Sequence, residues 1–404
     1  QTKLHDIIYI DVVKKIKFIK MKYLKSLLYS LPALCLLFSS VSYAAKADPD
    51  WDAFVKKYGR YTQKKLKNKG IPGAALSIVS TNNSDYIHTM GVTKTRNGQK
   101  VNKHTRFRLA SVSKTFAGSL SAKLANEGLL KLDKAVSDYI TEFKGTVYQD
   151  DLKVFHLLSH ASGLVPNAYD NLIESRMDYP SIVEKLLSVK PICKPGECYG
   201  YQNVMFSLIG NVILQSSGKS YAQWLRETIF APLKMSDASL GFESMVQDEN
   251  YALPHVRGTK RWYSAKLKKN YYKVGPAAGV NASASDMAIW LKAQLGQYPD
   301  VLSLDTLAKQ TRPYTHTKKE MHRRVWKKHL NEAYYGLGWR VYNYADETLY
   351  YHSGWVQGYR SDVVVFPQLN VGFSLIVNAE TGVINELTTE FIDRLLEYKR
   401  GKKI

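Results

Sequence analysis

The order of the predicted elements limits the fold more than any other feature of the sequence. Over residues 50–69 apolar side chains recur at helical spacing, and Gly70 and Pro72 end that pattern. Strand-like segments follow at 73–80 and 85–92, joined by a polar turn. A helix and a hairpin therefore open the folded part of the chain.

Strand-like segments return near the other end of the chain. They cover residues 347–354, 359–367 and 371–380, and an amphipathic helix is predicted over 383–397. The long middle of the sequence is mostly helical in pattern. We therefore expect an α/β (α+β) fold, in which both chain ends build one antiparallel sheet flanked by helices and the middle is inserted into it.

The predicted domain spans residues 45–404. Its α/β part is expected at about 45–132 and 293–404, and its helical part at about 133–292. A cleft between two such parts is the usual place for a functional site.

The first 44 residues are expected to lie outside this domain. Met21 begins a segment with two early lysines and an apolar run, and Ala44 ends it with a small residue. This pattern predicts a cleavable signal peptide over 21–44, and residues 1–20 are interpreted as upstream translation. The apolar run is short for a bilayer span, so an uncleaved anchor is the alternative. We expect a periplasmic or secreted protein with no membrane span after cleavage.

Two cysteines remain once Cys35 leaves with the signal. Cys193 and Cys198 flank a Pro-Gly turn, and in an oxidising compartment such a close pair is expected to form a disulfide. Two free thiols are the alternative. A metal site is not expected, because the segment holds no further Cys or His.

The chain is strongly basic, with a formal net charge of +22. Removing the seven Lys and two Asp of residues 1–44 leaves +17, which favours anionic surroundings such as peptidoglycan carboxylates. The stretches 259–273 and 316–329 interleave aromatic and basic residues, a pattern found in nucleic-acid-binding segments. Solvated loop faces are the preferred interpretation for an exported protein, so no nucleic-acid partner is expected.

The stretch RLASVSKTF carries the first candidate chemistry. Ser111 and Lys114 are one helical turn apart, and Ser111 occupies the place of a helix N-cap. A serine hydroxyl becomes a nucleophile when a nearby base takes its proton, and an amine can do so only if burial or a cation lowers its pKa. The alternative is a purely structural helix cap. Ser216 and Lys219 have the same spacing at a turn and are interpreted as a chance match.

Two further motifs follow Ser111 in a fixed order. Tyr201 and Asn203 form a Tyr-x-Asn motif directly after the proposed disulfide, and a His-Ser-Gly motif begins at His352 on a predicted strand. A second Tyr-x-Asn at 169–171 lies outside this order. Tyr201 has the alternative of a core tyrosine, and His160 is expected to be a buried structural histidine because its position suits no catalytic triad.

This motif order resembles that of class C β-lactamases, serine D-alanyl-D-alanine peptidases and related esterases. The likeness covers nearly all of residues 45–404. It implies that Ser111 forms an acyl-enzyme, that Lys114 activates it, and that Tyr201 exchanges protons with Ser111 and the leaving group. Whether the amine or the phenol is the base stays open.

The resemblance also implies a substrate-binding set, formed by Asn203, His352, Ser353, Gly354 and Trp355. The backbone N–H groups of Ser111 and Trp355 would form an oxyanion hole. Class C enzymes usually carry Lys where this chain has His352. Histidine titrates near 6.5, so we expect only a partial charge there at neutral pH.

The sequence thus predicts an exported serine hydrolase that needs no metal or organic cofactor. Its expected substrates are D-amino-acid amides of peptidoglycan-derived peptides, or β-lactams. A carboxylesterase or D-aminopeptidase acting on a small amide or ester is the first alternative. A non-catalytic cell-wall or nucleic-acid binder is the second. The sequence does not indicate an oligomeric state.

Overall fold

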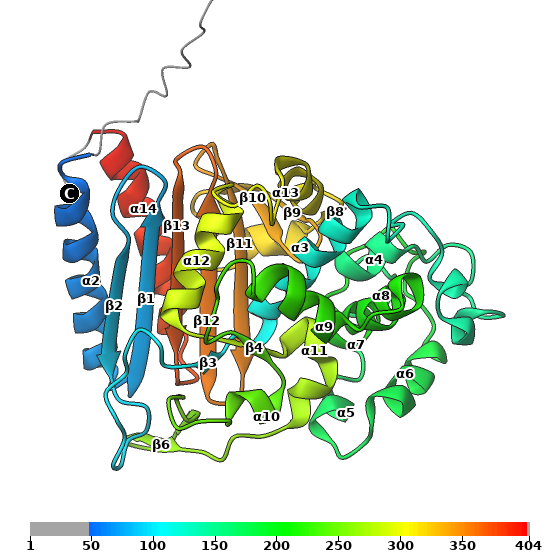
Figure 1. Cartoon of the computed structure of the whole chain (residues 1–404), viewed down its shortest axis with the longest axis horizontal. Coiled ribbons are helices and arrows are strands. Elements are labelled where there is room, and N and C mark those ends of the chain that lie inside the picture. Colours follow the sequence, from blue (N-terminus) through cyan, green and yellow to red (C-terminus); the bar gives the residue numbers. More distant parts are fainter. Residues whose placement is uncertain (1–47, 402–404) are drawn as a thin grey trace, which may run out of the picture. The chain divides into compact units, whose positions relative to one another are not determined.

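The computed structural model describes residues 48–401, and an eight-stranded antiparallel sheet is their largest element (Figure 1). The strand order is β2 (Tyr86–Gly91), β1 (Gly73–Ser80), β13 (Val371–Val377), β12 (Tyr359–Phe366), β11 (Glu347–Val356), β10 (Arg340–Tyr344), β9 (Leu330–Tyr335) and β8 (Thr315–His316). The N-terminal hairpin joins the C-terminal strands through β1 and β13, where Ala74 pairs with Val377. The expected sheet built from both chain ends is confirmed. Strands β8 to β10 were not predicted.

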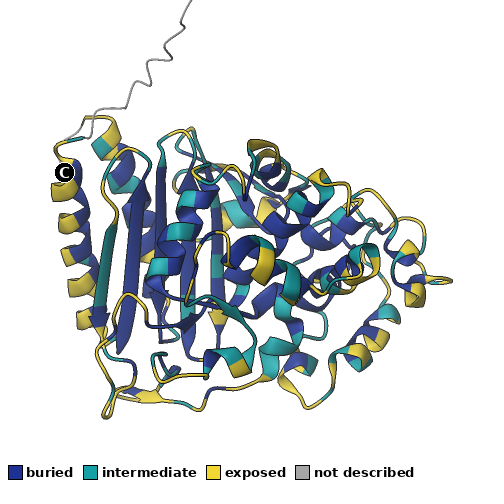
Figure 2. Cartoon of the chain, viewed as in Figure 1, coloured by how far each residue is buried: buried dark blue, intermediate teal, exposed yellow. Residues whose placement is uncertain are grey.

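Helices cover both faces of this sheet. One face carries α2 (Trp51–Asn68) and α14 (Val383–Lys399), and Phe373 of β13 stacks on Phe391 of α14 with ring centroids 4.5 Å apart. The opposite face carries α12 (Ala284–Gln294), which packs on β1 and β13. The central strands are therefore buried on both sides (Figure 2).

Short helices make up most of the middle of the chain. They are α4 (Val154–Leu158), α5 (Asp170–Glu174), α6 (Tyr179–Leu187), α7 (Asn203–Ser207), α8 (Ile209–Ser217), α9 (Tyr221–Leu225), α10 (Phe242–Met245) and α11 (Gly275–Ala278); α3 (Ser113–Asn126) precedes them and α13 (Leu304–Thr311) follows α12. The expected boundary near residue 292 falls inside α12. The division into an α/β part and a helical part stays a proposal.

Two small sheets accompany the large one. The first contains β3 (Phe107–Arg108), β7 (Val280–Ala282) and β4 (Ser239–Leu240), and the second contains β5 (His255–Arg257) and β6 (Trp262–Ser264). Strand β3 leads directly into the segment that carries Ser111. What holds β3 in place therefore also positions that serine.

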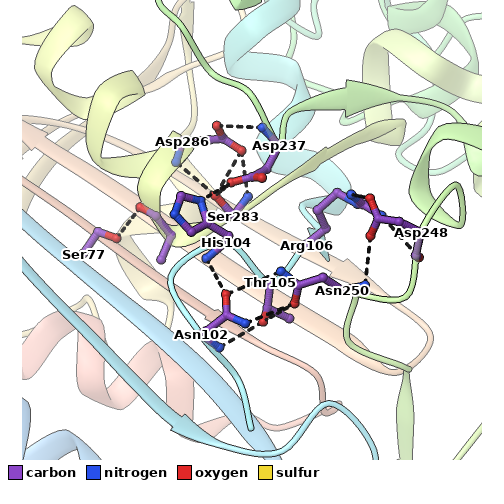
Figure 3. A network of polar contacts seen from close by, with 11 residues as sticks. Ser77, Asn102, His104, Thr105, Arg106, Asp237, Asp248, Asn250, Ser283 and Asp286 are labelled. Carbon is purple, nitrogen blue, oxygen red and sulfur yellow. Dashed lines mark hydrogen bonds and ion pairs between the residues drawn. The ribbon is translucent and has the colours of Figure 1, made fainter. Parts of the chain in front are cut away.

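A network of hydrogen bonds and ion pairs holds residues 102–106, just before β3, in place (Figure 3). Arg106 donates two hydrogen bonds, of 2.6 and 2.8 Å, to the carboxylate of Asp248. His104 lies 2.9 Å from Asp237, whose carboxylate also accepts a 2.8 Å hydrogen bond from Ser283. Ser283 in turn caps α12, so the approach to β3 is tied to a helix that lies on the main sheet.

In the two basic stretches, 259–273 and 316–329, the tryptophan side chains belong to the core. Trp262 and Trp326 are buried, while the lysines beside them are exposed. Tyr263 of the first stretch is exposed, so the interpretation of these stretches as solvated loop faces stays a prediction.

The predicted signal peptide at 21–44 and the segment 1–20 lie outside the described residues. Within residues 48–401, none of the helices has the length and apolar character needed to cross a membrane.

Asp362 on β12 provides a pH-dependent test of this fold. It is buried under α14, accepts a 2.6 Å hydrogen bond from Thr388, and burial raises its pKa to about 7 despite that bond. Because the folded pKa exceeds the unfolded one, the stability that the neutral carboxyl contributes is lost as pH rises towards 7. The free energy of unfolding of Asp362→Asn, measured relative to that of the unchanged protein, should therefore be about 2 kcal/mol more favourable to folding at pH 8 than at pH 5.

Urea unfolding at both pH values measures this difference. Exposed Asp133→Asn is the control and should show no such gain. An Asp362→Asn variant whose advantage stays constant between the two pH values would contradict the buried carboxyl.

Candidate active site

Ser111 lies in a single turn of 3₁₀ helix, η1 (Ala110–Val112), between β3 and α3. The expected N-cap role is wrong, because Val112 holds the cap position of α3 and Ser111 makes no capping bond. Ala110 has φ of +48°, in the left-handed region that non-glycine residues rarely adopt. This tight turn leaves Ser111 partly exposed while the residues on both sides are buried.

The close approach of β11 holds this turn in place. Gly354 lies so near η1 that a Cβ there would come within 2.1 Å of the carbonyl oxygen of Leu109. That carbonyl accepts a 2.6 Å hydrogen bond from Ser361 on β12. On the other side, the hydroxyl of Ser113 accepts a 2.9 Å bond from the backbone of Val280. The glycine of the His-Ser-Gly motif is thus required by packing.

The amine of Lys114 is fully buried among polar atoms. Its Nζ lies 2.7 Å from Oδ1 of Asn203, 3.1 Å from the carbonyl oxygen of Ala277 and 3.4 Å from Oγ of Ser111. Burial lowers the pKa of this amine well below its usual value; Asp170 opposes the shift and Arg340 adds to it. These are the conditions under which an amine near a serine can lose its proton.

The second motif reaches the site from the disulfide loop. Cys193 and Cys198 are bonded, as expected, and the chain then runs through Tyr201 to Asn203 at the start of α7. The amine of Lys114 lies 4.7 Å from the ring centroid of Tyr201. Burial raises the pKa of the Tyr201 phenol, although Arg340 and a hydrogen bond with Ser111 oppose the rise. The phenol therefore keeps its proton.

The expected partial charge on His352 is wrong. Its ring is fully buried, with Nδ1 2.8 Å from the carbonyl oxygen of Ser353 and Nε2 2.7 Å from the hydroxyl of Tyr335. Because a carbonyl can only accept, Nδ1 carries the proton and Nε2 accepts from the tyrosine. Burial, with the nearby charges of Arg340 and Lys114, lowers the pKa of this histidine well below its usual value.

The rest of the third motif lies at the edge of the site. Ser353 is partly exposed, and the side chain of Trp355 is 62% exposed with the guanidinium of Arg360 4.7 Å from its ring. The large side chain therefore points away from the core of the site.

Arg340 on β10 is a buried cation that the sequence did not single out. Its guanidinium lies 5.7 Å from the ring of Tyr201 and 5.6 Å from that of Tyr335, and it forms an ion pair with Glu320 at 3.7 Å. Burial opposes ionisation of Glu320, but the charges of Arg340 and Arg323 lower its pKa to about 2. Arg340 could not be assigned to the site from the sequence, because β8 to β10 were not recognised as strands.

His160 is buried and hydrogen-bonded, as predicted. Its Nδ1 accepts a 3.1 Å hydrogen bond from the backbone of Gln202. Ser216 and Lys219 stay apart from the site at the end of α8, where Lys219 forms an ion pair with Glu227.

The second Tyr-x-Asn motif is not wholly a chance match. Its middle residue, Asp170, accepts a 2.8 Å hydrogen bond from the side-chain amide of Asn203. Sequence reasoning missed this residue because only the first and third positions of the motif were considered.

No group of three or more His, Cys, Asp or Glu side chains within residues 48–401 is placed to hold a metal ion.

Gly354→Ala tests the close approach of β11 to η1. The added methyl group would meet backbone at 2.1 Å, so we expect a loss of about 1–3 kcal/mol in the free energy of unfolding. Gly382→Ala is the matched control, since no atom lies within 4 Å of its built Cβ. Chemical denaturation of both variants makes the comparison, and equal stabilities would contradict the packing described here.

The ring state of His352 can be observed directly by nitrogen NMR. We expect Nδ1 to carry the proton and no titration between pH 5.5 and 8, because burial keeps the ring neutral. Tyr335→Phe removes the donor to Nε2 and should shift that resonance. An inflection near pH 6.5 assigned to His352 would contradict the buried neutral ring.

The sequence is similar to those of several known proteins. Protein flp of Staphylococcus aureus is 25% identical over 345 residues, which cover 83% of this chain and 65% of that protein. This chain therefore spans 65% of the length of that relative. A β-lactamase of Yersinia enterocolitica is 25% identical over 285 residues, which cover 69% of this chain and 67% of the enzyme.

Solved structures share the fold. The octameric penicillin-binding protein homologue from Pyrococcus abyssi superposes with a TM-score of 0.74 at 21% identity, covering 86% of this chain and 78% of that one. A class C β-lactamase in complex with cefoxitin gives 0.72 at 20% identity, covering 86% and 99%. A family model described as Beta-lactamase matches residues 58–396, and the chain therefore belongs to the β-lactamase family.

Proposed function

We propose that this protein is an exported serine hydrolase that works through an acyl-enzyme on Ser111. Its proposed substrates are D-amino-acid amides of peptidoglycan peptides, β-lactams, or both. One observation carries the proposal: the buried amine of Lys114 lies between two oxygen acceptors and Oγ of Ser111.

The proton count at Lys114 supports a role as the base. A neutral amine has two N–H groups and one lone pair. Asn203 Oδ1 and the carbonyl of Ala277 each accept one N–H, which leaves the lone pair for the hydroxyl proton of Ser111. The lowered pKa of the amine favours this neutral state.

Tyr201 is then proposed as the proton donor to the leaving group. Its raised pKa keeps the phenol protonated, so it is poorly suited to be the first base. Ser111 Oγ attacks the carbonyl carbon and its proton passes to Lys114. The leaving nitrogen receives a proton from Tyr201, which Lys114 restores, and water then hydrolyses the acyl-enzyme.

The backbone N–H groups of Ser111 and Trp355 are proposed to bind the oxyanion. Removing one such donor typically costs about 3 kcal/mol of transition-state stabilisation. The close packing of Gly354 against Leu109 and Ala110 supports this role, because it keeps the two backbone segments adjacent. Asn203 and Ser353 are proposed to contact the rest of the substrate.

The neutral state of His352 limits how a substrate carboxylate could be held. His352 supplies no cation, and the positive charge of Arg340 is buried beside Glu320. A lysine, whose usual pKa is about 10.4, favours the charged state at neutral pH far more than a histidine does. Recognition is therefore proposed to rely on neutral hydrogen bonds more than in class C enzymes with lysine at that position.

Export is proposed from the signal-like sequence at 21–44 and from the Cys193–Cys198 bond, since disulfides persist mainly in oxidising compartments. A carboxylesterase or D-aminopeptidase on the same site is the alternative enzyme. A non-catalytic binder is disfavoured by the contacts that Lys114 makes with Ser111 and Asn203.

Covalent labelling tests the nucleophile. A fluorescent penicillin and a fluorophosphonate should add to Ser111, as located by mass spectrometry, and Ser111→Ala should abolish the adduct. Ser216→Ala, at the chance motif, should be labelled like the unchanged protein. An adduct elsewhere, or none with either reagent, would exclude the acyl-enzyme.

Lys114→Arg separates charge from basicity. Arginine keeps a positive charge but cannot give up its proton at neutral pH, so we expect acylation to slow by at least about 100-fold. Stopped-flow acylation rates measure this effect, with thermal unfolding as the check on folding. Acylation near the original rate would remove Lys114 as the base.

A substrate panel then ranks the enzyme alternatives. A chromogenic cephalosporin, a D-Ala-D-Ala peptide, a D-amino-acid anilide and a nitrophenyl ester are compared by kcat/KM. The proposal requires the peptide or the cephalosporin to be turned over faster than the ester and the anilide.

A further inference from the structure

The segment from Val165 to Asp170, which leads into α5, contacts each residue of the Tyr201 to Asn203 motif. The backbone N–H of Asn167 donates to the carbonyl of Tyr201 at 2.7 Å. The side chain of Gln202 donates to the carbonyl of Val165. The third contact joins the Asn203 amide to Asp170, at 2.8 Å. These three bonds hold Asp170 beside the catalytic side chains.

The contact with Asp170 decides which way the Asn203 amide faces. A carboxylate only accepts hydrogen bonds, so the NH₂ group of Asn203 has to face Asp170 and its oxygen has to face Lys114. A reversed amide would present N–H to the amine. That N–H would occupy the lone pair that Ser111 requires.

Asp170 is also the acidic neighbour of Lys114. The charged or titratable groups around the amine are Arg340 on β10, His352 on β11, Tyr201, His160 and Asp170. Arg340 is a cation paired with Glu320, while the two histidines and the phenol are neutral. Burial raises the pKa of Asp170, but the hydrogen bond from Asn203 opposes that rise, and the Asp170 carboxylate in turn raises the pKa of Lys114. The other oxygen of Asp170, Oδ1, is buried without a hydrogen-bond partner. A buried unpaired oxygen lowers the stability of the fold, so stability alone does not explain a carboxylate at this position.

We propose that Asp170 is a positioning residue for the nucleophile: through Asn203 it holds the lone pair of Lys114 towards Ser111, and its charge offsets that of Arg340. The proposal deepens the acyl-enzyme function proposed above and rests on it. Asp170 does not touch the reacting atoms. It acts through the hydrogen-bonded series Asp170, Asn203, Lys114 and Ser111.

Two substitutions separate its two effects. Asp170→Asn removes the charge but keeps an oxygen that can accept from Asn203. Asp170→Ala removes both. Glu174→Gln is the matched control, because Glu174 lies on the same helix and its side chain bonds to Asn270, outside the series.

The first measurement needs no substrate. The protonation of Lys114 is followed by NMR of lysine labelled with carbon-13 at Cε, with the resonance assigned by Lys114→Arg. Losing a nearby anion disfavours the protonated amine, so the pKa of Lys114 should fall by about one unit in Asp170→Asn and in Asp170→Ala. Glu174→Gln should change it much less.

The second measurement is the rate of Ser111 acylation against pH. Because the rate rises as Lys114 deprotonates, the acid limb should move to lower pH by the same amount in Asp170→Asn, with the plateau near its original value. In Asp170→Ala the plateau should also fall by about tenfold or more, because the amide of Asn203 is no longer oriented.

The outcomes are distinguishable. Unchanged titration of Lys114 in a folded Asp170→Asn variant overturns the charge effect, and an unchanged plateau in Asp170→Ala overturns the orienting effect. Absence of any acyl-enzyme in the unchanged protein overturns the proposed function instead. The Lys114 titration still decides about Asp170 in that case.

Discussion

The removal of one amine from water is the interaction on which this site depends. Lys114 is surrounded by the Tyr201 ring, the amide of Asn203 and the backbone of Ala277, and none of its surface is exposed. In water this amine would be a cation and useless as a base near neutral pH. Folding lowers its pKa, and the same burial raises that of Tyr201. One physical cause thus shifts the two pKa values in opposite directions, as the proposed proton-transfer roles require.

Burial of that amine requires parts from distant regions of the chain. The turn that carries Ser111 is bounded by Gly354 on β11 and by Ser361 on β12, while Asn203 comes from the helical middle. The sheet supplies a rigid wall, and the shorter helices supply polar groups directed towards it. Small packing changes at the glycine therefore act on the chemistry as well as on stability.

Sequence patterns predicted the first and last elements well because their apolar residues repeat strongly. The helix over 50–69 and the strand at 73–80 agree with α2 and β1 within one or two residues. Strand β10 was missed because the charged Arg340 occupies a buried position while the apolar Val341 beside it is only half-buried, which reverses the expected apolar alternation. With β10 unrecognised, Arg340 could not be placed beside Tyr201.

The motifs correctly predicted that Ser111, Lys114, Tyr201 and Asn203 lie close together. They could not predict the protonation states of these side chains. The state of His352 depends on complete burial and on Tyr335, which belongs to a strand that the sequence did not reveal. Asp170 was missed for a similar reason, since its importance comes from a neighbour 33 residues later in the chain. Such information exists only in the folded contacts.

The pairing of β1 with β13 has a consequence for biosynthesis. Residues 74–80 leave the ribosome about 300 residues before their partners at 371–377, so the hairpin β1–β2 has an unpaired edge during most of synthesis. Pairing over such a long separation is slow and depends on the complete chain. The nascent protein should therefore remain a client of chaperones until β13 emerges, and a chain shortened before β13 would lack the strand that joins the β1–β2 hairpin to the rest of the sheet.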